Sequence, residues 1–239
     1  MRVFLAGASG AIGRRLVPLL VRAGHQVTGT TRSAQSGKEL ARAGVTPAVL
    51  DIFDAPAVAD AVRAARPDAI IHQLTDLPRE FDEAKVVASY PLNARIRTEG
   101  TRNLVAAAQA AAVRRFIVQS IAFAYAPSRG PHPESDPLNV ADGPRVVTAR
   151  GAAAMEEQVL GADRLEGIVL RYGRFYGPGT WYEGPGQRPG LHIDAAAQAA
   201  LMALSRGARG IYNIADDDGV VSIAKAVAEL GFEPAFRLA

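Results

Sequence analysis

The stretch Met1-Arg-Val-Phe-Leu-Ala-Gly7-Ala-Ser-Gly10-Ala-Ile-Gly13-Arg-Arg-Leu-Val-Pro-Leu-Leu-Val-Arg-Ala-Gly24 decides the fold of this chain. A short apolar run ends on three glycines spaced three residues apart, and apolar residues at helical spacing follow them. This is the order strand, glycine turn, helix. A pyrophosphate needs free backbone N–H groups, and a helix N-terminus supplies them with a favourable dipole. The stretch therefore predicts a dinucleotide-binding turn rather than an ordinary glycine-rich turn.

The coenzyme contacts are expected at this turn and at the ends of the strands that follow it. A side chain at Gly7 or Gly10 would hold a ligand off the backbone, and one at Gly13 would push the helix away from the strand. The predicted contact residues are Gly7, Ser9, Gly10, Ala11, Ile12, Gly13, Thr31, Arg32, Asp51, Ile52, Gln73 and Leu74.

The region after the second strand favours NADP over NAD. In NAD-selective sites an acidic residue about 20 positions past the glycines binds the ribose 2′-hydroxyl. Here the first acidic residue of the chain is Glu39, and the strand ends on Thr31-Arg32-Ser33. A guanidinium with two hydroxyls suits a 2′-phosphate. The alternative is that Arg32 is an ordinary surface arginine.

Composition limits the class of protein. The 239 residues suit one large domain, or one domain with a small appendage, and 49% hydrophobic residues are ample for a core. No apolar run is long enough for a membrane span, and cysteine is absent, which excludes disulfides and thiolate sites. The net charge of +3 is scattered, unlike a nucleic-acid groove. We expect a cytoplasmic protein without a signal peptide, a membrane or a nucleic-acid partner.

Strand and helix patterns alternate along the chain. Strands are expected at 26–30, 46–50, 68–73, 115–120, 166–171 and 210–214, and helices at 55–65, 93–112, 148–160, 194–205 and 220–230. Residues 124–147 and 172–190 are expected to be long irregular segments. The alternation predicts an α/β fold of Rossmann type, with a doubly wound parallel sheet. We expect a dinucleotide-binding domain at 1–170 and a reduced C-terminal substrate lobe at 171–239, interleaved as one structural unit.

Several polar residues have structural alternatives to a role in the site. Asp51 or its neighbour Asp54 could cap the helix at 55–65 instead of contacting adenine. His72, inside an apolar strand, is interpreted as a core histidine. The acidic clusters 132–136 and 216–218 adjoin proline or glycine and are interpreted as turns, so no metal is predicted.

With these pieces in place, the chain resembles the extended or atypical short-chain dehydrogenase/reductases, in their NAD(P)-dependent epimerase/dehydratase branch. The resemblance runs through nearly the whole chain, and it implies a Rossmann sheet of about seven strands with a small C-terminal substrate lobe. The matching segments are Gly-Ala-Ser-Gly-Ala-Ile-Gly (7–13), Asp51-Ile52, Ile-Ile-His-Gln-Leu (70–74), Glu-Gly-Thr-Arg-Asn-Leu (99–104), Phe-Ile-Val-Gln-Ser (116–120), Leu-Arg-Tyr-Gly-Arg-Phe-Tyr-Gly-Pro-Gly (170–179) and His192-Ile-Asp194.

The chain departs from this family at the catalytic residues. Members usually carry Tyr-x-x-x-Lys, in which the tyrosine protonates a carbonyl and the lysine lowers its pKa and holds the ribose. None of the three lysines here, Lys38, Lys85 and Lys225, follows a tyrosine by four residues. The usual serine, tyrosine and lysine positions fall on Ile121, Thr148 and Ala152 (or, one residue later, on Ala149 and Ala153), and Arg97 stands where an active-site Asn is usual.

Three functions are compatible with these residues. The first, which we favour, is an NADP-binding oxidoreductase or epimerase that acts on a carbonyl, hydroxyl or sugar-nucleotide small molecule, with Tyr125 as substitute donor and Ser120 orienting it. Tyr176 and His132 are further candidate donors. The second is a redox-neutral isomerase, lyase or cyclase. The third is a non-catalytic NAD(P)-sensing regulator. The resemblance also implies a homodimer through helices 93–112 and 148–160.

Overall fold

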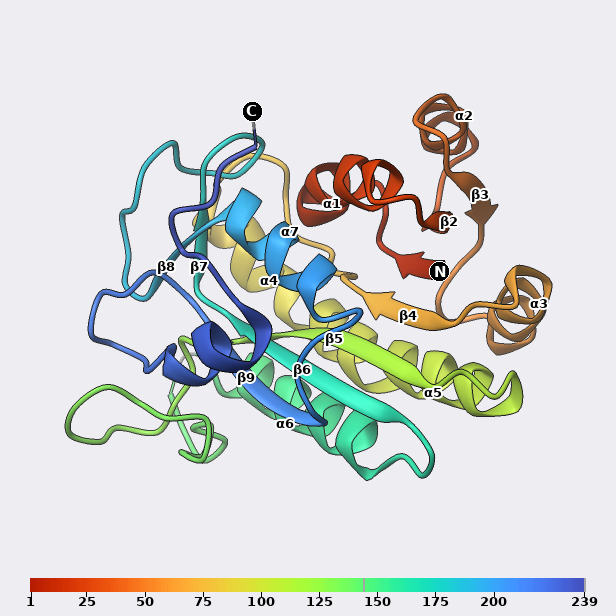
Figure 1. Ribbon diagram of the computed structural model, residues 1–239. Helices are drawn as coiled ribbons and strands as arrows, with labels where there is room; N and C mark the ends of the chain where they lie inside the picture. Colours follow the sequence, from red (N-terminus) through yellow and green to blue (C-terminus); the bar gives the residue numbers. More distant parts are fainter. Residues whose placement is uncertain (144, 239) are drawn as a thin grey trace.

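The computed structural model describes residues 1–143 and 145–238 and shows an α/β fold (Figure 1). Seven strands form one sheet in the order β3-β2-β1-β4-β5-β6-β9, and β7 and β8 form a separate pair. The elements are β1 (Arg2–Ala6), α1 (Ala11–Arg22), β2 (Gln26–Thr31), α2 (Ala34–Arg42), β3 (Thr46–Val49), α3 (Ala55–Ala65), β4 (Ala69–His72), α4 (Glu83–Arg95), η1 (Ile96–Gly100), α5 (Thr101–Ala110), β5 (Arg115–Ile121), α6 (Val146–Gly161), β6 (Glu166–Tyr172), β7 (Arg174–Tyr176), β8 (Gly190–His192), α7 (Ile193–Met202), β9 (Gly210–Ile214) and η2 (Ala226–Leu230). The predicted Rossmann-type parallel sheet is confirmed.

All neighbouring strands of the large sheet run parallel, so their carboxyl ends meet at one edge. The chain winds outward from β1 in both directions, to β2 and β3 on one side and to β4 on the other. A doubly wound sheet opens a crevice at the strand where the order reverses. The carboxyl end of β1, where the glycine turn begins, is that position.

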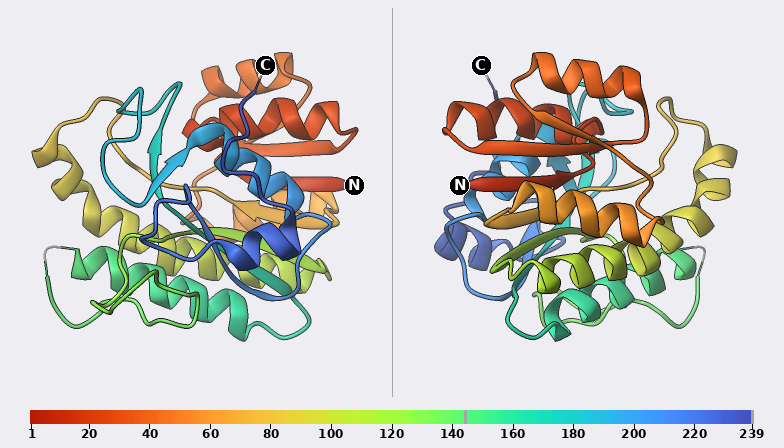
Figure 2. Two further views of the ribbon diagram at one scale, coloured as in Figure 1. Left: turned by 60° about the vertical axis from the view of Figure 1, so that its left-hand side comes forward. Right: turned by 90° about the vertical axis from the view of Figure 1, so that its right-hand side faces the viewer.

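Helices cover both faces of the sheet because side chains alternate along each strand. Leu5 and Ile71 belong to the core cluster that includes α1 and α7, whereas Phe4 and Ile70 belong to the cluster that includes α3, α5 and α6. Figure 2 shows the two helical layers on opposite sides of the strands. The helices that pack on both faces therefore fix the positions of the strand ends at which the site lies.

The long helix predicted at 93–112 begins ten residues earlier, at Glu83, and runs through η1 to Ala110. Asp82 caps it by accepting a hydrogen bond from the Lys85 backbone N–H at 3.1 Å. Asn93 ties the added turns to the preceding loop through its amide group, which donates to the Asp76 carbonyl at 3.1 Å. The prediction was wrong here because a helix interrupted by Pro91 has little amphipathic pattern.

The remaining differences are smaller. The helix predicted at 148–160 spans Val146–Gly161, and α2 was not predicted. The segment 172–190 contains β7 and β8, which pair in parallel. The last helix covers only residues 224–230, because Ser222 extends toward His132 and donates its N–H to that residue's carbonyl at 2.9 Å. Within the described residues, no helix combines the length and the apolar character that crossing a bilayer requires.

Candidate functional site

The glycine turn between β1 and α1 leaves no room for side chains. Gly7 has a φ of +94°, and a Cβ added there would lie 2.9 Å from the Gln73 carbonyl oxygen. A Cβ at Gly13 would lie 2.3 Å from the Gly7 carbonyl oxygen and 2.4 Å from that of Ala8. These contacts are with backbone atoms, which cannot rotate away as a side chain would. The turn therefore presents bare backbone at the sheet edge.

The start of α1 offers free donors at this turn. No side chain caps the helix at Gly10, and its first turn contains no acidic residue. Within the described residues, the backbone N–H groups of Ala11, Ile12 and Gly13 have no acceptor. Unpaired N–H groups at a helix N-terminus bind anions such as phosphate. The turn therefore fits the diphosphate of a dinucleotide.

Residues of β2 support the turn. The Gly7 backbone N–H donates to Thr30 Oγ1 at 3.0 Å, and Ser9 Oγ donates to Thr31 Oγ1 at 3.3 Å. Thr30 is buried, so its hydroxyl fixes the turn rather than contacting a ligand. Its role was not predicted because it lies 23 residues from Gly7 and matches no local motif.

Arg32 extends from the end of β2 toward the loop after β4. Its Nη2 donates to Asp76 Oδ1 at 2.6 Å, and its side chain is 72% exposed. Ser33, predicted to assist it, caps α2 by accepting from the Ser36 backbone N–H at 3.1 Å. Because β1 lies between β2 and β4, the Arg32–Asp76 pair crosses the carboxyl end of β1.

The segment after β3 carries two exposed carboxylates, Asp51 and Asp54. Asp54 caps α3 by accepting from the Ala57 backbone N–H at 3.0 Å, while Asp51 accepts from the backbone N–H of Phe53 at 3.0 Å. Of the two aspartates considered as the N-cap of α3, Asp54 is therefore the one that caps it. Ile52 is buried and closes against Gly100 of η1, where an added Cβ would lie 3.1 Å from its Cγ1.

The end of β4 carries a buried histidine and a partly paired glutamine. His72 is fully buried, its Nε2 lies 3.2 Å from Thr101 Oγ1, and burial lowers its pKa to about 3. The prediction of a core histidine is confirmed. Gln73 donates through Nε2 to the Tyr172 hydroxyl at 3.3 Å, but its buried Oε1 has no partner among the described residues. Leu74 packs partly buried beside it, and its N–H donates to His72 Nδ1 at 3.2 Å.

Ser120, at the end of β5, belongs to a buried ion-pair network. Its Oγ donates to Glu156 Oε1 at 2.6 Å, and Arg171 donates to both oxygens of that carboxylate, at 2.9 and 2.7 Å. Burial by itself would lower the pKa of Arg171, but the hydrogen bond and charge of Glu156 raise it. The Ser120 hydroxyl is therefore committed to a carboxylate that is already neutralised.

Tyr125 lies beside Arg171, whose guanidinium carbon is 4.9 Å from the centroid of the tyrosine ring. Its hydroxyl donates to Asn213 Oδ1 at 2.6 Å, and its ring stacks on His132 with centroids 4.8 Å apart. Burial raises its pKa. No hydrogen bond joins Tyr125 to Ser120 in the described part of the chain, so their joint catalytic role stays a prediction.

The positions of the family's tyrosine and lysine contain no proton donor of that kind. Ala152 is fully buried, and Ile121 is buried at the end of β5. Thr148 is buried, and its Oγ1 has no partner among the described residues. Arg97, in the π-helical segment η1, is 8% exposed and donates through Nη1 to the Thr148 carbonyl at 3.3 Å. Burial lowers its pKa to about 10.

The two acidic clusters serve local structure. His132 Nδ1 pairs with Asp136 Oδ2 at 2.8 Å, and Glu134 accepts from the Asn213 backbone N–H at 2.9 Å. In the second cluster, Asp218 accepts from the Gly190 backbone N–H at 3.1 Å. Tyr176, another candidate donor, accepts from Arg237 Nη2 at 3.3 Å.

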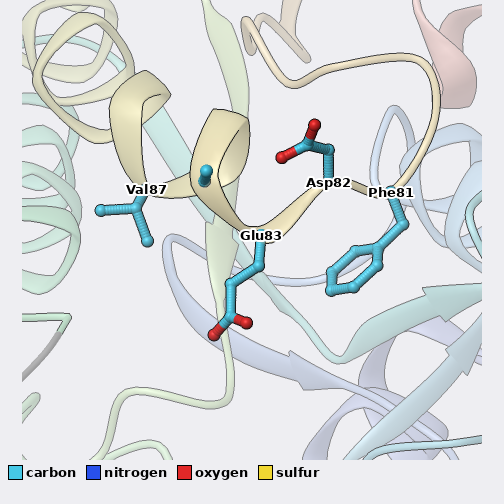
Figure 3. A pocket seen from close by; sticks show the side chains of 5 residues that line it. Phe81, Asp82, Glu83 and Val87 are labelled. Atoms are coloured by element: carbon cyan, nitrogen blue, oxygen red, sulfur yellow. The ribbon is translucent and has the colours of Figure 1, made fainter.

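An open hollow of about 810 Å³ lies at the start of α4. Figure 3 shows Phe81 and Glu83 on one side of the chain and Asp82, the helix cap, on the other. Phe81 packs edge-on against Trp181, with ring centroids 5.5 Å apart. Trp181 Nε1 donates to the Pro78 carbonyl at 2.9 Å, so the loops after β4 and β7 are joined at this rim.

Comparison with known proteins agrees with this geometry. The family described as NAD(P)H-binding matches residues 7–184. A 3-diazoavenalumate denitrifying reductase from a Streptomyces species is 40% identical over 91% of this chain and 77% of its own length. Two solved structures share the fold: the UDP-glucose 4-epimerase of Thermotoga maritima with UDP-glucose, and that of Thermus thermophilus with NAD. The first has a TM-score of 0.82 and 18% identity, over 99% of this chain and 94% of that one. The second has a TM-score of 0.81 and 22% identity, over 100% and 95%.

The bare glycine turn, the free helix donors and these matches lead to one assignment. The chain belongs to the NAD(P)H-binding family, and it is an NAD(P)-dependent enzyme of the oxidoreductase type.

Proposed function

We propose that this enzyme is an NADPH-dependent reductase of diazo compounds, a class of acceptor that gains a hydride without receiving a proton from the protein. The observation that carries the proposal is the combination of an intact diphosphate cradle with Thr148 and Ala152 at the positions of the family's tyrosine and lysine. The similar Streptomyces reductase, whose name specifies a diazo substrate and the removal of nitrogen, supports it.

The chemistry explains why the donor is dispensable. A bound, reduced nicotinamide dinucleotide supplies a hydride, that is, one hydrogen with two electrons. A carbonyl that gains a hydride becomes an alkoxide and needs a proton, usually from a positioned acid. An aryl diazonium ion, R–N₂⁺, that gains a hydride becomes neutral R–N=N–H. This species separates into R–H and N₂, so the protein has only to bind and orient the acceptor.

The residues of the site divide this work. The N–H groups at the start of α1 would hold the diphosphate, and Asp51 and Ile52 would contact the adenine. Ser120 and Arg171 both donate to Glu156, so this carboxylate stabilises the floor of the site and is not free to act as a base. Gln73 Oε1 and Thr148 Oγ1 are two buried polar atoms without a partner among the described residues, and they are available to contact an acceptor or the nicotinamide amide.

The decisive experiment uses purified full-length protein, NADPH and the 4-carboxybenzenediazonium ion. We expect coenzyme oxidation together with release of N₂ and benzoate. NADPH deuterated at the transferred position should be oxidised more slowly than NADPH, because the transferred C–D bond is broken in the hydride step. A rate equal to the protein-free rate would contradict the proposal, and so would oxidation of NADPH only by ketones and aldehydes.

Tyr125→Phe separates this function from a carbonyl reductase with a tyrosine donor. Diazo reduction should stay within about twofold of the original rate, because its hydrogen comes from the coenzyme. Loss of most carbonyl turnover in this variant would favour the carbonyl reductase. Interconversion of UDP-glucose and UDP-galactose without net consumption of coenzyme would instead favour an epimerase.

The preference for NADP rests on Arg32. Its exposed guanidinium is within reach of a 2′-phosphate if it exchanges the Asp76 carboxylate for that group. Arg32→Asp should shift relative affinity from NADPH toward NADH by about tenfold or more, since a charge-assisted hydrogen bond is replaced by repulsion. Asp76→Asn should strengthen NADPH binding relative to NADH. Unchanged affinity ratios in both variants would remove Arg32 from coenzyme selection.

The proposal also includes a homodimer and a substrate lobe at residues 171–239. The dimer would pair the helices predicted at 93–112 and 148–160, as the resemblance to the family implies. Light scattering after size exclusion should give twice the chain mass of 25.2 kDa, and a monomer mass would contradict it. A cytoplasmic location stays a prediction.

A further inference from the structure

Arg174 is a half-buried arginine without an ion-pair partner among the residues that the structure describes. It stands two residues after the end of β6 and begins β7. Its Nε is buried and has no hydrogen-bond partner in the same part of the chain. The guanidinium carbon lies 4.2 Å from the centroid of the Phe123 ring. The charge is therefore held in place by an aromatic face rather than by an acid.

A second arginine contacts the same ring, and a third, Arg97, contacts the first turn of the helix that the second one caps. Arg145, the N-cap residue of α6, lies 5.7 Å from the same Phe123 ring. Arg97 contacts the backbone of Thr148, which stands three residues after Arg145 in the first turn of α6. None of the three forms an ion pair in the part of the chain that the structure describes. Burial lowers the pKa of Arg97 and of Arg174 to about 10, so both stay charged at neutral pH.

This arrangement costs stability unless an anion joins it. Uncompensated charge near or below the surface loses solvation, and like charges repel one another. Stacking on Phe123 fixes the plane of the Arg174 guanidinium and leaves its edge N–H groups free. A planar guanidinium edge matches a carboxylate in a two-bond fork. The flat Phe123 ring beside it suits the ring of an aromatic acid.

We propose that Arg97, Arg145, Arg174 and Phe123 form a binding site for the carboxylate of a planar aromatic acid, with Arg174 as its two-bond partner. The site lies at the carboxyl ends of β5 and β6, whereas the glycine turn lies at the end of β1. The proposal rests on the proposed function for the reaction of this ligand, but its binding is tested separately. The positive cluster gives a zwitterionic diazo acid, R–N₂⁺ with a carboxylate, a counter-charge on the side away from the diazo group.

The test is calorimetry of the full-length protein, with and without NADP⁺, using 2-naphthoate and its uncharged analogue 2-naphthamide as probes. We expect the acid to bind at least about tenfold more tightly than the amide, and the advantage to fall as salt is raised. Arg174→Gln should reduce binding of the acid to that of the amide. Arg174→Lys should bind 2-naphthoate with an affinity between those of the unmodified protein and of Arg174→Gln, since lysine keeps the charge but cannot form two parallel hydrogen bonds. Arg209→Gln is the matched control, because Arg209 is exposed at the opposite edge of the sheet, before β9, and should change nothing.

Equal binding of acid and amide to the unmodified protein would overturn the proposal without any variant. Unchanged 2-naphthoate binding in a folded Arg174→Gln protein would overturn it as well. If 2-naphthoate binding depends on Arg174 but diazonium ions are not reduced, the anion site stands and the proposed reaction fails. If Arg174→Gln reduces diazonium ions with the same rate and KM as the unmodified protein, the proposed reaction stands and the proposed site is wrong.

Discussion

The two halves of the sheet edge offer a ligand different kinds of contact. The cofactor half, at the ends of β1, β2 and β4, presents backbone N–H groups that glycines leave uncovered. The acceptor half, at the ends of β5 and β6, presents side chains, among them the neutralised Glu156–Arg171 pair and the unpaired Arg97, Arg145 and Arg174. The first half therefore offers the backbone contacts that a dinucleotide needs, while the second offers charged side chains in place of the family's tyrosine and lysine.

The strongest effect is expected in the cofactor half, from Gly13→Ala. The added Cβ meets two backbone oxygens, at 2.3 and 2.4 Å, so helix and turn must separate. We expect the Kd for NADPH to rise by about 100-fold or more in calorimetry, with a lower melting temperature. Gly161→Ala is the control, because nothing lies within 4 Å of its added Cβ. Coenzyme binding at the original affinity would show that this turn does not hold the diphosphate.

The next effect, in the acceptor half, comes from Glu156→Gln. The change leaves Arg171 buried without its carboxylate and should lower the free energy of unfolding by about 3–5 kcal/mol in urea denaturation. Glu157→Gln, on the exposed side of the same helix turn, should change it by less than about 0.5 kcal/mol. Similar losses in both variants would mean that the buried pair is not what holds this half together.

The pH dependence of stability tests whether buried His72, at the boundary between the two halves, stays unprotonated in the folded protein. Its pKa is about 3 in the folded protein because of burial, against 6.5 for an exposed histidine. Below pH 6.5 the unfolded chain binds a proton that the folded chain does not, so stability falls as pH falls. By pH 5 the original protein should have lost about 2 kcal/mol more than His72→Gln. Parallel pH curves would mean that the folded protein accepts the proton on His72.

The smallest effect has the opposite sign. Arg97→Met removes a buried guanidinium that forms no ion pair within the described residues and interacts with Glu156 only through its charge, and it should raise the free energy of unfolding by about 1 kcal/mol. The same change should weaken 2-naphthoate binding. Arg102→Met, one helical turn away and exposed, should do neither. Destabilisation by Arg97→Met would show that the guanidinium contributes more to the fold than to a ligand site.

More of the cofactor half than of the acceptor half could be predicted from the sequence. The glycine turn, the parallel sheet and the ends of most strands followed from local patterns, because backbone geometry and alternation depend on neighbouring residues. The start of α4 did not, since its added turns depend on the Asp82 cap and on Asn93, which bonds to the carbonyl of Asp76, 17 residues away. The donor roles predicted for Tyr125 and Ser120 stay predictions, and the structure directs their hydroxyls to Asn213 and Glu156.

The sequence by itself determined that a coenzyme cradle opens the first helix and that the family's tyrosine and lysine are missing, because both depend on which residues stand a few positions apart. Only the tertiary structure decided which charges are paired. Glu156 accepts hydrogen bonds from Ser120 and Arg171, which lie 36 and 15 residues away in the chain. Arg32 donates to Asp76, which lies 44 residues away. The two arginines at the Phe123 ring come from the start of α6 and from β7, and they form no ion pair among the described residues. Partners so distant in the chain meet only because packed helices and strands bring their ends to one edge of the sheet.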